Sequence, residues 1–314
     1  MTPTSAPIAH AASSRWLQAC GLFLCAMVAL ATLDMLAKDL MARHASALVN
    51  LVRYGVVLLL AVLLMVVRKV SWYVPPGSRH TLLWRGVMLG TVGLTFMQAL
   101  RTMPLAEATA IYFLAPLIIV ALSPWLLGEQ VRRAQVIAVI AGFAGMLLIV
   151  RPGGTLPLTG TLLMLMAATA YALVQVLTRC LTGRIGMEQQ FAWTAVACTV
   201  MTVLSLPLAD SLAWPGAHDF AQMVLIGVLS GVGQYLLIEV FQRASASSLA
   251  PFNYFHLLLA VAFSVLVFGQ RPDLLAMSGI AVISLAGLSL VLPVFRTHFS
   301  ASRLSRQSSR KGLP

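Results

Sequence analysis

Charged side chains inside long apolar stretches are the residues of this sequence best placed to do chemistry. Asp34 and Lys38 lie four residues apart at the end of one such stretch, and Arg53 lies about two turns into the next. On a helix, residues four apart share a face, so Asp34 and Lys38 can neutralise each other. Charges within a membrane cost free energy and tend to face each other or a polar cavity. Asp34, Lys38 and Arg53 are therefore candidate coupling or gating charges.

Asp34 and Arg53 are expected at similar depth, near one membrane face. A helix that starts at Trp16 and rises about 1.5 Å per residue places Asp34 about 27 Å along its axis. Two interpretations stay open. The residues form an interfacial ion pair that ties two helices together, or they form an outer site for a carboxylate or a proton.

A polar cluster occurs deeper in another apolar stretch, in PFNYFHLL at 251–258. Asn253 and His256 are three residues apart, which places them on one face of a helix with Tyr254 between them. An imidazole there can hydrogen-bond a planar or anionic solute, or change its protonation state. The alternative is a helix-to-helix hydrogen bond worth about 0.6 kcal/mol. Asn253, Tyr254 and His256 are the first candidates for solute binding.

The composition identifies the elements that must hold these residues. The chain is 60% hydrophobic and 10% charged, whereas soluble domains contain about 25% charged residues. Segments of about 20 apolar residues can cross a membrane as helices. Ten such segments occur, near 16–36, 47–67, 82–100, 105–126, 134–150, 158–178, 190–209, 220–241, 248–268 and 274–293. The expected fold class is an all-α integral membrane protein with ten transmembrane helices.

The net charge of +12 reflects basic residues between the spans and in the tail 294–314. This distribution fits the excess of Lys and Arg in cytoplasmic loops and not a nucleic-acid partner. Both termini, including the segment 1–15, are expected in the cytoplasm, and the tail is expected near anionic membrane lipids. The expected location is the plasma membrane, which is the inner membrane in a bacterium. The four cysteines lack CxxC spacing, so neither a metal site nor a cofactor is expected.

The two halves of the chain resemble each other. AEATAIYFLAPLIIVALS at 106–123 aligns with SLAPFNYFHLLLAVAFSV at 248–265, and GVMLG at 86–90 matches GVLSG at 227–231. We interpret the chain as two five-helix repeats, 16–152 and 158–293. Because five is odd, the second repeat must be inverted in the membrane. Inverted repeats are typical of secondary transporters, where two oppositely oriented halves expose one site alternately to each side.

The repeat adds further candidates. Tyr112 and Tyr254 are equivalent and could flank a ligand, although aromatic packing is an equal alternative. Gln98 matches Glu239 to within one residue, so both could face a cavity from opposite ends. The ordinary interpretation of Glu239 is a helix-end pair with Arg243. Other polar candidates for the lining are Tyr171, Gln175 and Gln234.

Glu107 is a further candidate gating charge at the start of the fourth span. It follows Pro104 by three residues, and a proline with an acid close behind is ordinary chemistry at the start of a helix. The sequence leaves both interpretations of Glu107 open.

The chain resembles the drug/metabolite transporter superfamily, and within it the EamA-type family. The resemblance rests on RTMPLAEATAIYFLAPLIIVALSPWLLGEQ from Arg101, on its fainter echo from Arg243 to Pro293, and on LDMLAK followed by LVRY. It implies a transporter whose third, fourth, eighth and ninth spans line a central cavity. This chain departs from a symmetrical site, because Asn253 and His256 replace Ile111 and Leu114 of the first repeat.

The leading functional hypothesis is a secondary transporter of small organic metabolites that works by alternating access. GxxxxGK[ST] is absent, which argues against direct use of ATP. An integral-membrane enzyme acting on lipids is the second hypothesis, although HExxH and GxSxG are also absent and no catalytic residue is assigned. A sensor or scaffold is the third. The solute, the direction of transport, any proton or ion coupling and the oligomeric state stay open.

Overall fold

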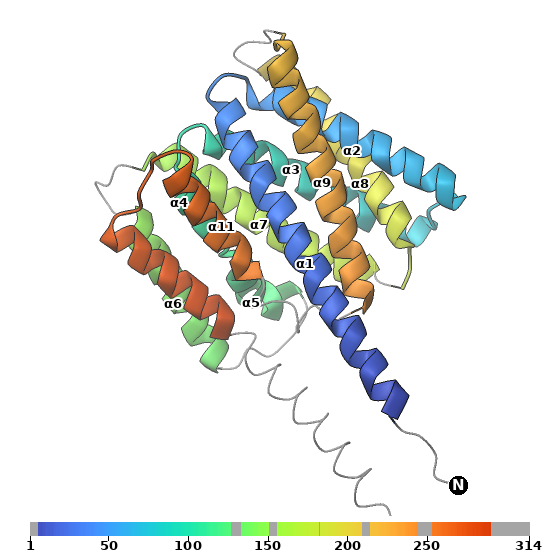
Figure 1. The fold of residues 1–314 in the computed structure, drawn as a ribbon, viewed down its shortest axis with the longest axis horizontal. Helices are drawn as coiled ribbons and strands as arrows, with labels where there is room; N and C mark the ends of the chain where they lie inside the picture. The colour runs from blue at the N-terminus through green and yellow to red at the C-terminus, as the bar shows by residue number, and fades with distance from the viewer. Residues whose placement is uncertain are drawn as a thin grey trace, which may run out of the picture.

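The structure is a computed structural model that describes residues 6–126, 133–150, 156–181, 183–208, 214–243 and 253–289. Within these ranges all regular structure is helical, as the sequence predicted (Figure 1). The elements are α1 (Ala6–Met41), α2 (Ser46–Arg68), α3 (Pro76–Leu100), α4 (Leu105–Tyr112), α5 (Ala115–Leu126), α6 (Arg133–Val150), α7 (Leu158–Leu181), α8 (Met187–Ser205), the short 3-10 helix η1 (Leu206–Leu208), α9 (Ala217–Arg243) and α11 (Asn253–Leu266). A further helix, Leu274–Ser289, follows α11.

Most of these helices are long and apolar enough to cross a membrane. In the described residues, six segments meet this criterion by length and composition alone: Cys20–Met41, Ser46–Arg68, Leu105–Leu122, Arg133–Val150, Leu158–Thr178 and Ala217–Leu237. The segments Phe255–Leu266 and Leu274–Ser289 are apolar but shorter. Helices α3 and α8, with 25 and 19 residues, correspond to two further predicted spans and do not meet this criterion. The order of helices fits the ten predicted spans.

One predicted span is broken in the middle, where α4 ends and α5 begins. Pro116 has no N–H group, so it cannot donate to the Tyr112 carbonyl oxygen four residues earlier. The Leu117 amide donates to the Leu114 carbonyl oxygen at 2.9 Å, which tightens the chain there. Leu114 is fully buried, and irregular backbone in a membrane helix is tolerated where protein surrounds it. The break lies directly after the Tyr112 ring.

Contacts between the two halves are reciprocal. Helix α1 packs against α9 as α7 packs against α3, and α2 packs against α9 as α8 packs against α3. Helix α1 also contacts α11 as α7 contacts α4, while the pairs α2–α8 and α4–α11 join equivalent helices. Exchanging the halves therefore reproduces the same set of helix pairs, which is the arrangement expected of two repeats of one unit.

The matching glycine motifs lie at equivalent contacts between the halves. A Cβ atom on Gly86 of α3 would collide with Ala197 of α8. A Cβ atom on Gly227 of α9 would lie 2.6 Å from the Val56 Cβ of α2. Because glycine has no side chain, the helix backbones approach closely at both places. The sequence match between 86–90 and 227–231 thus corresponds to one interface used twice.

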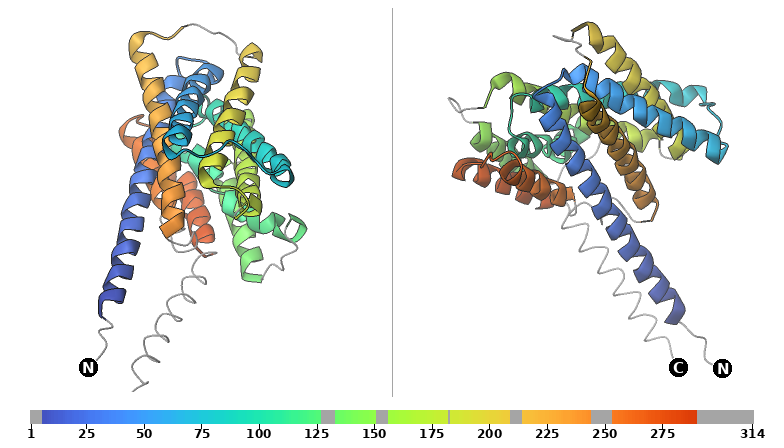
Figure 2. Two further views of the ribbon diagram at one scale, coloured as in Figure 1. Left: turned by 90° about the vertical axis from the view of Figure 1, so that its right-hand side faces the viewer. Right: turned by 45° about the horizontal axis from the view of Figure 1, so that its top comes forward.

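The bundle has a pair of helices at each of two opposite edges and a set of central helices between them. Helix α6 and the helix Leu274–Ser289 lie at one edge, and α2 and α8 lie at the other (Figures 1 and 2). Between them pass α1, α3 and α7, and the main hydrophobic core gathers there with α4, around the fully buried Leu40, Leu100, Ile111 and Met164. The N-terminal turns of α1 extend beyond the bundle (Figure 2).

Candidate functional site

A carboxylate and an imidazole meet between the two halves. Asp34 on α1 and His256 on α11 lie 3.0 Å apart, from Oδ2 to Nε2. Their exposed fractions are 7% and 9%, so bulk water hardly reaches either group. Helix α1 belongs to the first half and α11 to the second. The pair therefore links the halves inside the bundle.

The structure corrects the partner that the sequence suggested for Asp34. The sequence favoured Arg53 as the partner, with both residues near a membrane face. Helix α1 continues to Met41, which places Asp34 about 10 Å inside the end of the helix. In the described part of the chain Arg53 forms no ion pair with Asp34, and His256 takes that place. Arg53 lies at a similar depth in α2, but its guanidinium packs at Gly93 of α3, so the predicted Asp34–Arg53 ion pair is not formed.

A series of aromatic rings leads to this pair. The Tyr112 ring at the end of α4 lies 5.2 Å from the ring of Phe96 and 5.2 Å from that of Tyr171, measured between centroids. The Phe113 ring lies 5.9 Å from the His256 imidazole. The Tyr112 ring also lies 6.5 Å from the Phe113 ring, so three of the predicted site residues, Tyr112, Tyr171 and His256, belong to one aromatic cluster.

The Arg53 side chain packs against α3 at Gly93. A Cβ atom on Gly93 would lie 2.6 Å from the Arg53 Nη2 atom and would collide with the Tyr54 hydroxyl. The Arg53 guanidinium carbon lies 4.2 Å from the centroid of the Tyr54 ring. One turn earlier, the Asn50 amide donates to the Gly93 carbonyl oxygen at 3.1 Å. Asn50, Arg53 and Tyr54 thus converge on the space that Gly93 leaves.

Lys38 caps the C-terminal end of α3 and does not pair with Asp34. Its ammonium group donates to the carbonyl oxygens of Leu100 and Met103 at 2.6 and 2.7 Å. These carbonyls follow the last turn of α3, where helical partners are missing. Glu107, in the first turn of α4, is 8% exposed and interacts electrostatically with Lys38. Lys38 therefore joins α1 to the α3–α4 connection.

Ionic contacts join the halves at the end of the bundle where α1 meets α2, which we call the α1–α2 end. Asp219 of α9 accepts from Arg43 Nη1 at 2.6 Å and lies 2.6 Å from His44 Nε2. Arg43 also pairs with Asp39. The residues Arg43 and His44 come from the first half and Asp219 from the second, so this cluster holds the two halves together.

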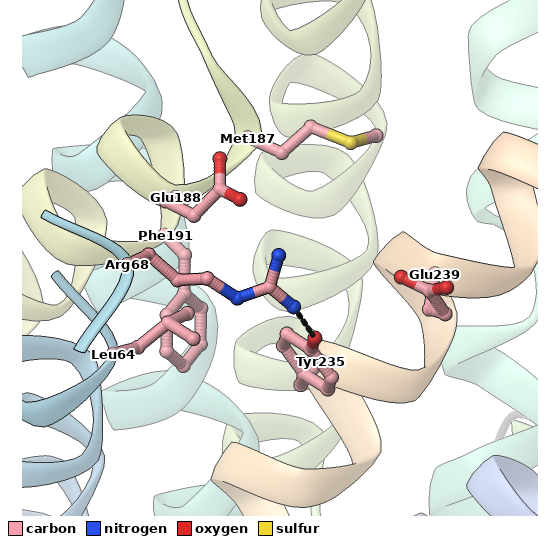
Figure 3. A pocket seen from close by; sticks show the side chains of 7 residues that line it. All are labelled: Leu64, Arg68, Met187, Glu188, Phe191, Tyr235 and Glu239. Atoms are coloured by element: carbon pink, nitrogen blue, oxygen red, sulfur yellow. Dashed lines mark hydrogen bonds between the residues drawn. The ribbon is translucent and has the colours of Figure 1, made fainter. Parts of the chain in front are cut away.

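The opposite end of the bundle carries a pocket between α2, α8 and α9 (Figure 3). It is lined by Leu64, Arg68, Met187, Glu188, Phe191, Tyr235 and Glu239. The Arg68 Nη2 atom donates to the Tyr235 hydroxyl at 3.0 Å, and both side chains point into the same space (Figure 3). One cation and two carboxylates face this pocket, and Glu239 is the predicted site residue among them.

The remaining predicted residues do not all join the centre. Gln98 accepts a hydrogen bond from the Ser46 hydroxyl at 2.7 Å, at the α1–α2 end. Gln175 on α7 and Gln234 on α9 are partly exposed and form no hydrogen bond with the central pair. The side chains of Asn253, Tyr254 and Arg243 lie outside the described residues, so the predictions for them stay predictions.

The structure gives a part-buried cation contacts that the sequence analysis did not predict. Arg85 lies near the start of the predicted span 82–100, which suggested a place at the cytoplasmic membrane surface. Helix α3 starts earlier, at Pro76, and carries Arg85 inside the bundle. Its Nε atom donates to Thr178 of α7 at 2.8 Å, and Nη1 donates to Thr194 of α8. Pro76 is the signal that could have placed Arg85 well inside the helix, because proline is favoured at helix starts.

The donor set for a metal is lacking in the part of the chain that the structure describes, where no three His, Cys, Asp or Glu residues cluster. Cys20 and Cys198 are buried and Cys25 and Cys180 are exposed, all as free thiols.

Apolar helices in two reciprocal halves, with the Asp34–His256 pair buried between them, indicate a multi-pass membrane protein built from two repeats. The chain belongs to the EamA-like transporter family, whose model matches it twice, at residues 17–151 and 158–292. The family and the similar proteins below are transporters of small molecules and not enzymes.

Relatives with curated names agree on this class and differ in cargo. The chain is 30% identical to a riboflavin transporter of Rhizobium johnstonii over 65% of its own length and 68% of that protein. It is 24% identical to an S-adenosylmethionine uptake transporter of Rickettsia conorii, over 65% and 67% of the two chains. It is 27% identical to the pseudopaline exporter CntI of Pseudomonas aeruginosa, over 67% and 74%.

A solved crystal structure supports the fold alone. It superposes with a TM-score of 0.64 at 22% identity and covers 89% of this chain and 98% of its own.

Proposed function

We propose that this protein is a secondary transporter that moves small organic metabolites by alternating access. The observation that carries the proposal is the Asp34–His256 pair, which is buried and contributed by both halves. If the halves rock against each other, the surroundings of this pair must change, because each partner moves with its own half. The relatives named as uptake transporters and as an exporter support small organic solutes as cargo and leave the direction open.

The proposal includes an orientation. The repeats 16–152 and 158–293 are inverted, both termini lie in the cytoplasm of a bacterial inner membrane, and the α1–α2 end faces outward. Support comes from the basic residues of the loops and tail. Ser71 and Gly216 follow the second helix of each repeat and are both exposed. Single cysteines at Ser71 and Gly216 in a cysteine-free background should react from opposite faces of the membrane, and reaction from one face would refute inversion.

Flux in sealed proteoliposomes that contain only this protein tests the function. Vesicles are loaded with a bacterial metabolite extract, and the solutes that leave are identified by mass spectrometry. Loss of solute from protein-containing vesicles, and not from empty ones, is the expected result. An absence of flux for every solute would favour the sensor, scaffold or membrane-enzyme alternatives.

Variants of two aspartates on α1 connect the flux to the central pair. Asp34→Asn leaves His256 without its charged partner in a buried place, and removing one partner of such a pair costs about 3 to 5 kcal/mol. The initial rate at equal protein should fall by about tenfold or more. Asp39→Asn is the control, because Asp39 lies on the same helix with a side chain 47% exposed. Equal rates in both variants would remove the pair from the pathway.

Proton coupling is also part of the proposal and rests on His256. The titratable groups near it are Asp34 from α1 and Tyr112 from α4, which interacts electrostatically with Asp34. His256→Gln retains a hydrogen-bonding group, but the glutamine side chain cannot take up a proton and become a cation. This variant should still exchange solute while its net flux no longer responds to a pH gradient. An unchanged response to the gradient would place coupling elsewhere.

A further inference from the structure

We propose that Arg53, Asn50 and Arg85 form a subsite for an organic anion, whose carboxylate or phosphate oxygens bind Arg53 and whose N–H or O–H group binds Asn50. This inference rests on the proposed transport function and names the chemical class of the solute.

The first argument is a buried cation with an unused donor. Arg53 is 7% exposed, and its Nε atom has no hydrogen-bond partner. In the described part of the chain, Arg53 has no carboxylate within ion-pair distance, since Asp34 pairs with His256. An unpaired charge inside a membrane protein is costly and is retained mainly at functional sites. A guanidinium with an unused N–H donor is suited to bind an oxygen of a carboxylate or phosphate.

The second argument is an unused acceptor one turn away. Asn50 is fully buried, and its amide nitrogen donates to the Gly93 carbonyl oxygen. Its Oδ1 atom has no partner. A buried acceptor without a partner costs about 1 to 3 kcal/mol. Because Asn50 and Arg53 are three residues apart, the free acceptor and the free donor lie on the same face of α2. A ligand that satisfies both must accept from Arg53 and donate to Asn50.

The third argument is the charge balance of the central region. Arg85 is hydrogen-bonded to the hydroxyl groups of Thr178 and Thr194, which are neutral. Arg53 and Arg85 both act electrostatically on the Cys198 thiol, so they lie in one neighbourhood. The neighbouring carboxylate is Asp34, and His256 is neutral or positive. The two arginines therefore leave a net positive charge in either protonation state of His256, which favours an anion.

The subsite adjoins the central pair. The Tyr112 hydroxyl interacts electrostatically with both Asp34 and Arg53, so the pair and the arginine share this tyrosine as a neighbour. Gly93 provides the space for the Arg53 guanidinium and the Tyr54 hydroxyl. An anion held by Arg53 would therefore lie beside the residues proposed to carry the solute through the bundle.

The test is thermal unfolding of the purified full-length protein in detergent. The probe is a bacterial small-molecule extract separated by anion exchange into an anionic fraction and a fraction of neutral and cationic compounds. The anionic fraction should raise the unfolding temperature, and the other fraction should not. Treating the anionic fraction with phosphatase distinguishes the two sources: loss of the effect identifies phosphate esters, and survival identifies carboxylates.

Two variants assign the effect to the subsite. Arg53→Gln should need about tenfold more of the anionic fraction for the same shift, because a charge-assisted hydrogen bond is lost. Asn50→Asp places a carboxylate beside Arg53, so the protein should stay folded and its response to anions should disappear. Arg79→Gln is the control, since Arg79 is exposed and bonds only the Val74 carbonyl oxygen among described residues.

The outcomes separate this inference from the transport function. No shift with the anionic fraction, an equal shift with the other fraction, or a full response in Asn50→Asp overturns the anion subsite. Flux of neutral metabolites without flux of anions in the proteoliposomes also overturns it, while the transporter proposal stands. A shift that depends on Arg53 without any flux supports the subsite and refutes transport.

Discussion

The two ends of the helix bundle differ in how the halves meet. At the α1–α2 end, Asp219 of the second half contacts Arg43 and His44 of the first, and Lys38 binds the carbonyls of Leu100 and Met103. At the opposite end, a pocket separates α2, α8 and α9 (Figure 3). Charged groups are present at both ends. At the α1–α2 end Asp219 bridges the halves, and Lys38 ties α1 to α3 within the first half. At the other end charged side chains line the pocket, and Arg68 bonds Tyr235 across the halves.

With the proposed orientation, the ionic contacts between the halves lie at the outer end, and the pocket lies at the cytoplasmic end. Alternating access requires the reverse state as well, so the contacts of Asp219 with Arg43 and His44 must break and re-form during transport. Contacts that must break are expected to be partly exposed and moderate in strength, which fits an ion pair with 42% and 17% exposed side chains.

The largest effect is expected for Lys38→Met. The substitution removes two short hydrogen bonds from a charged donor, and such bonds contribute about 1.5 to 3 kcal/mol each. The unfolding temperature in detergent should fall clearly. Lys69→Met at the opposite end is the control, because Lys69 is exposed, and it should leave the temperature nearly unchanged. Equal effects of the two substitutions would contradict the contrast between the ends.

A smaller effect is expected for Asp219→Asn, which weakens the contacts with Arg43 and His44. Ala45 lies at the same end and is 7% exposed, so a cysteine there reports opening. Its reaction with a water-soluble maleimide should become about twofold to fivefold faster, as expected for a partly exposed ion pair. The matched variant is Asp39→Asn, which removes one contact of Arg43 within its own half and should change the rate less. An unchanged rate in Asp219→Asn would show that these contacts do not hold the end closed.

The smallest effect is expected for Arg68→Gln in the pocket. Arg68 is exposed and donates to the Tyr235 hydroxyl, which lies at an end that is already hollow. The unfolding temperature should stay nearly unchanged. The reactivity of the cysteine at Ala45 should stay within about twofold of that in the parent protein. Tyr235→Phe removes the same hydrogen bond and keeps the ring, so it should behave alike. A loss of stability as large as that of Lys38→Met would mean that both ends are closed.

The sequence by itself determined the helical fold, the order of spans and the two-repeat plan. Apolar length and the match between 86–90 and 227–231 are properties of the chain that do not depend on neighbours in space. Family membership followed from the same signals. Tyr112, Tyr171 and His256 were candidates from the sequence alone, because polar and aromatic groups stand out in apolar segments, and their role in binding stays a prediction.

Only the tertiary structure decided which of these groups meet. His256 pairs with Asp34 across 222 positions of sequence, while Arg53 turns to Gly93. Hydropathy underestimated α1 and α3, because a helix continues into polar sequence that no apolar count includes. A shift of a few residues changes the depth of a side chain by about 1.5 Å per residue, and its rotation about the helix by about 100° per residue. Partners between helices depend on both quantities, and packing of the two halves sets them.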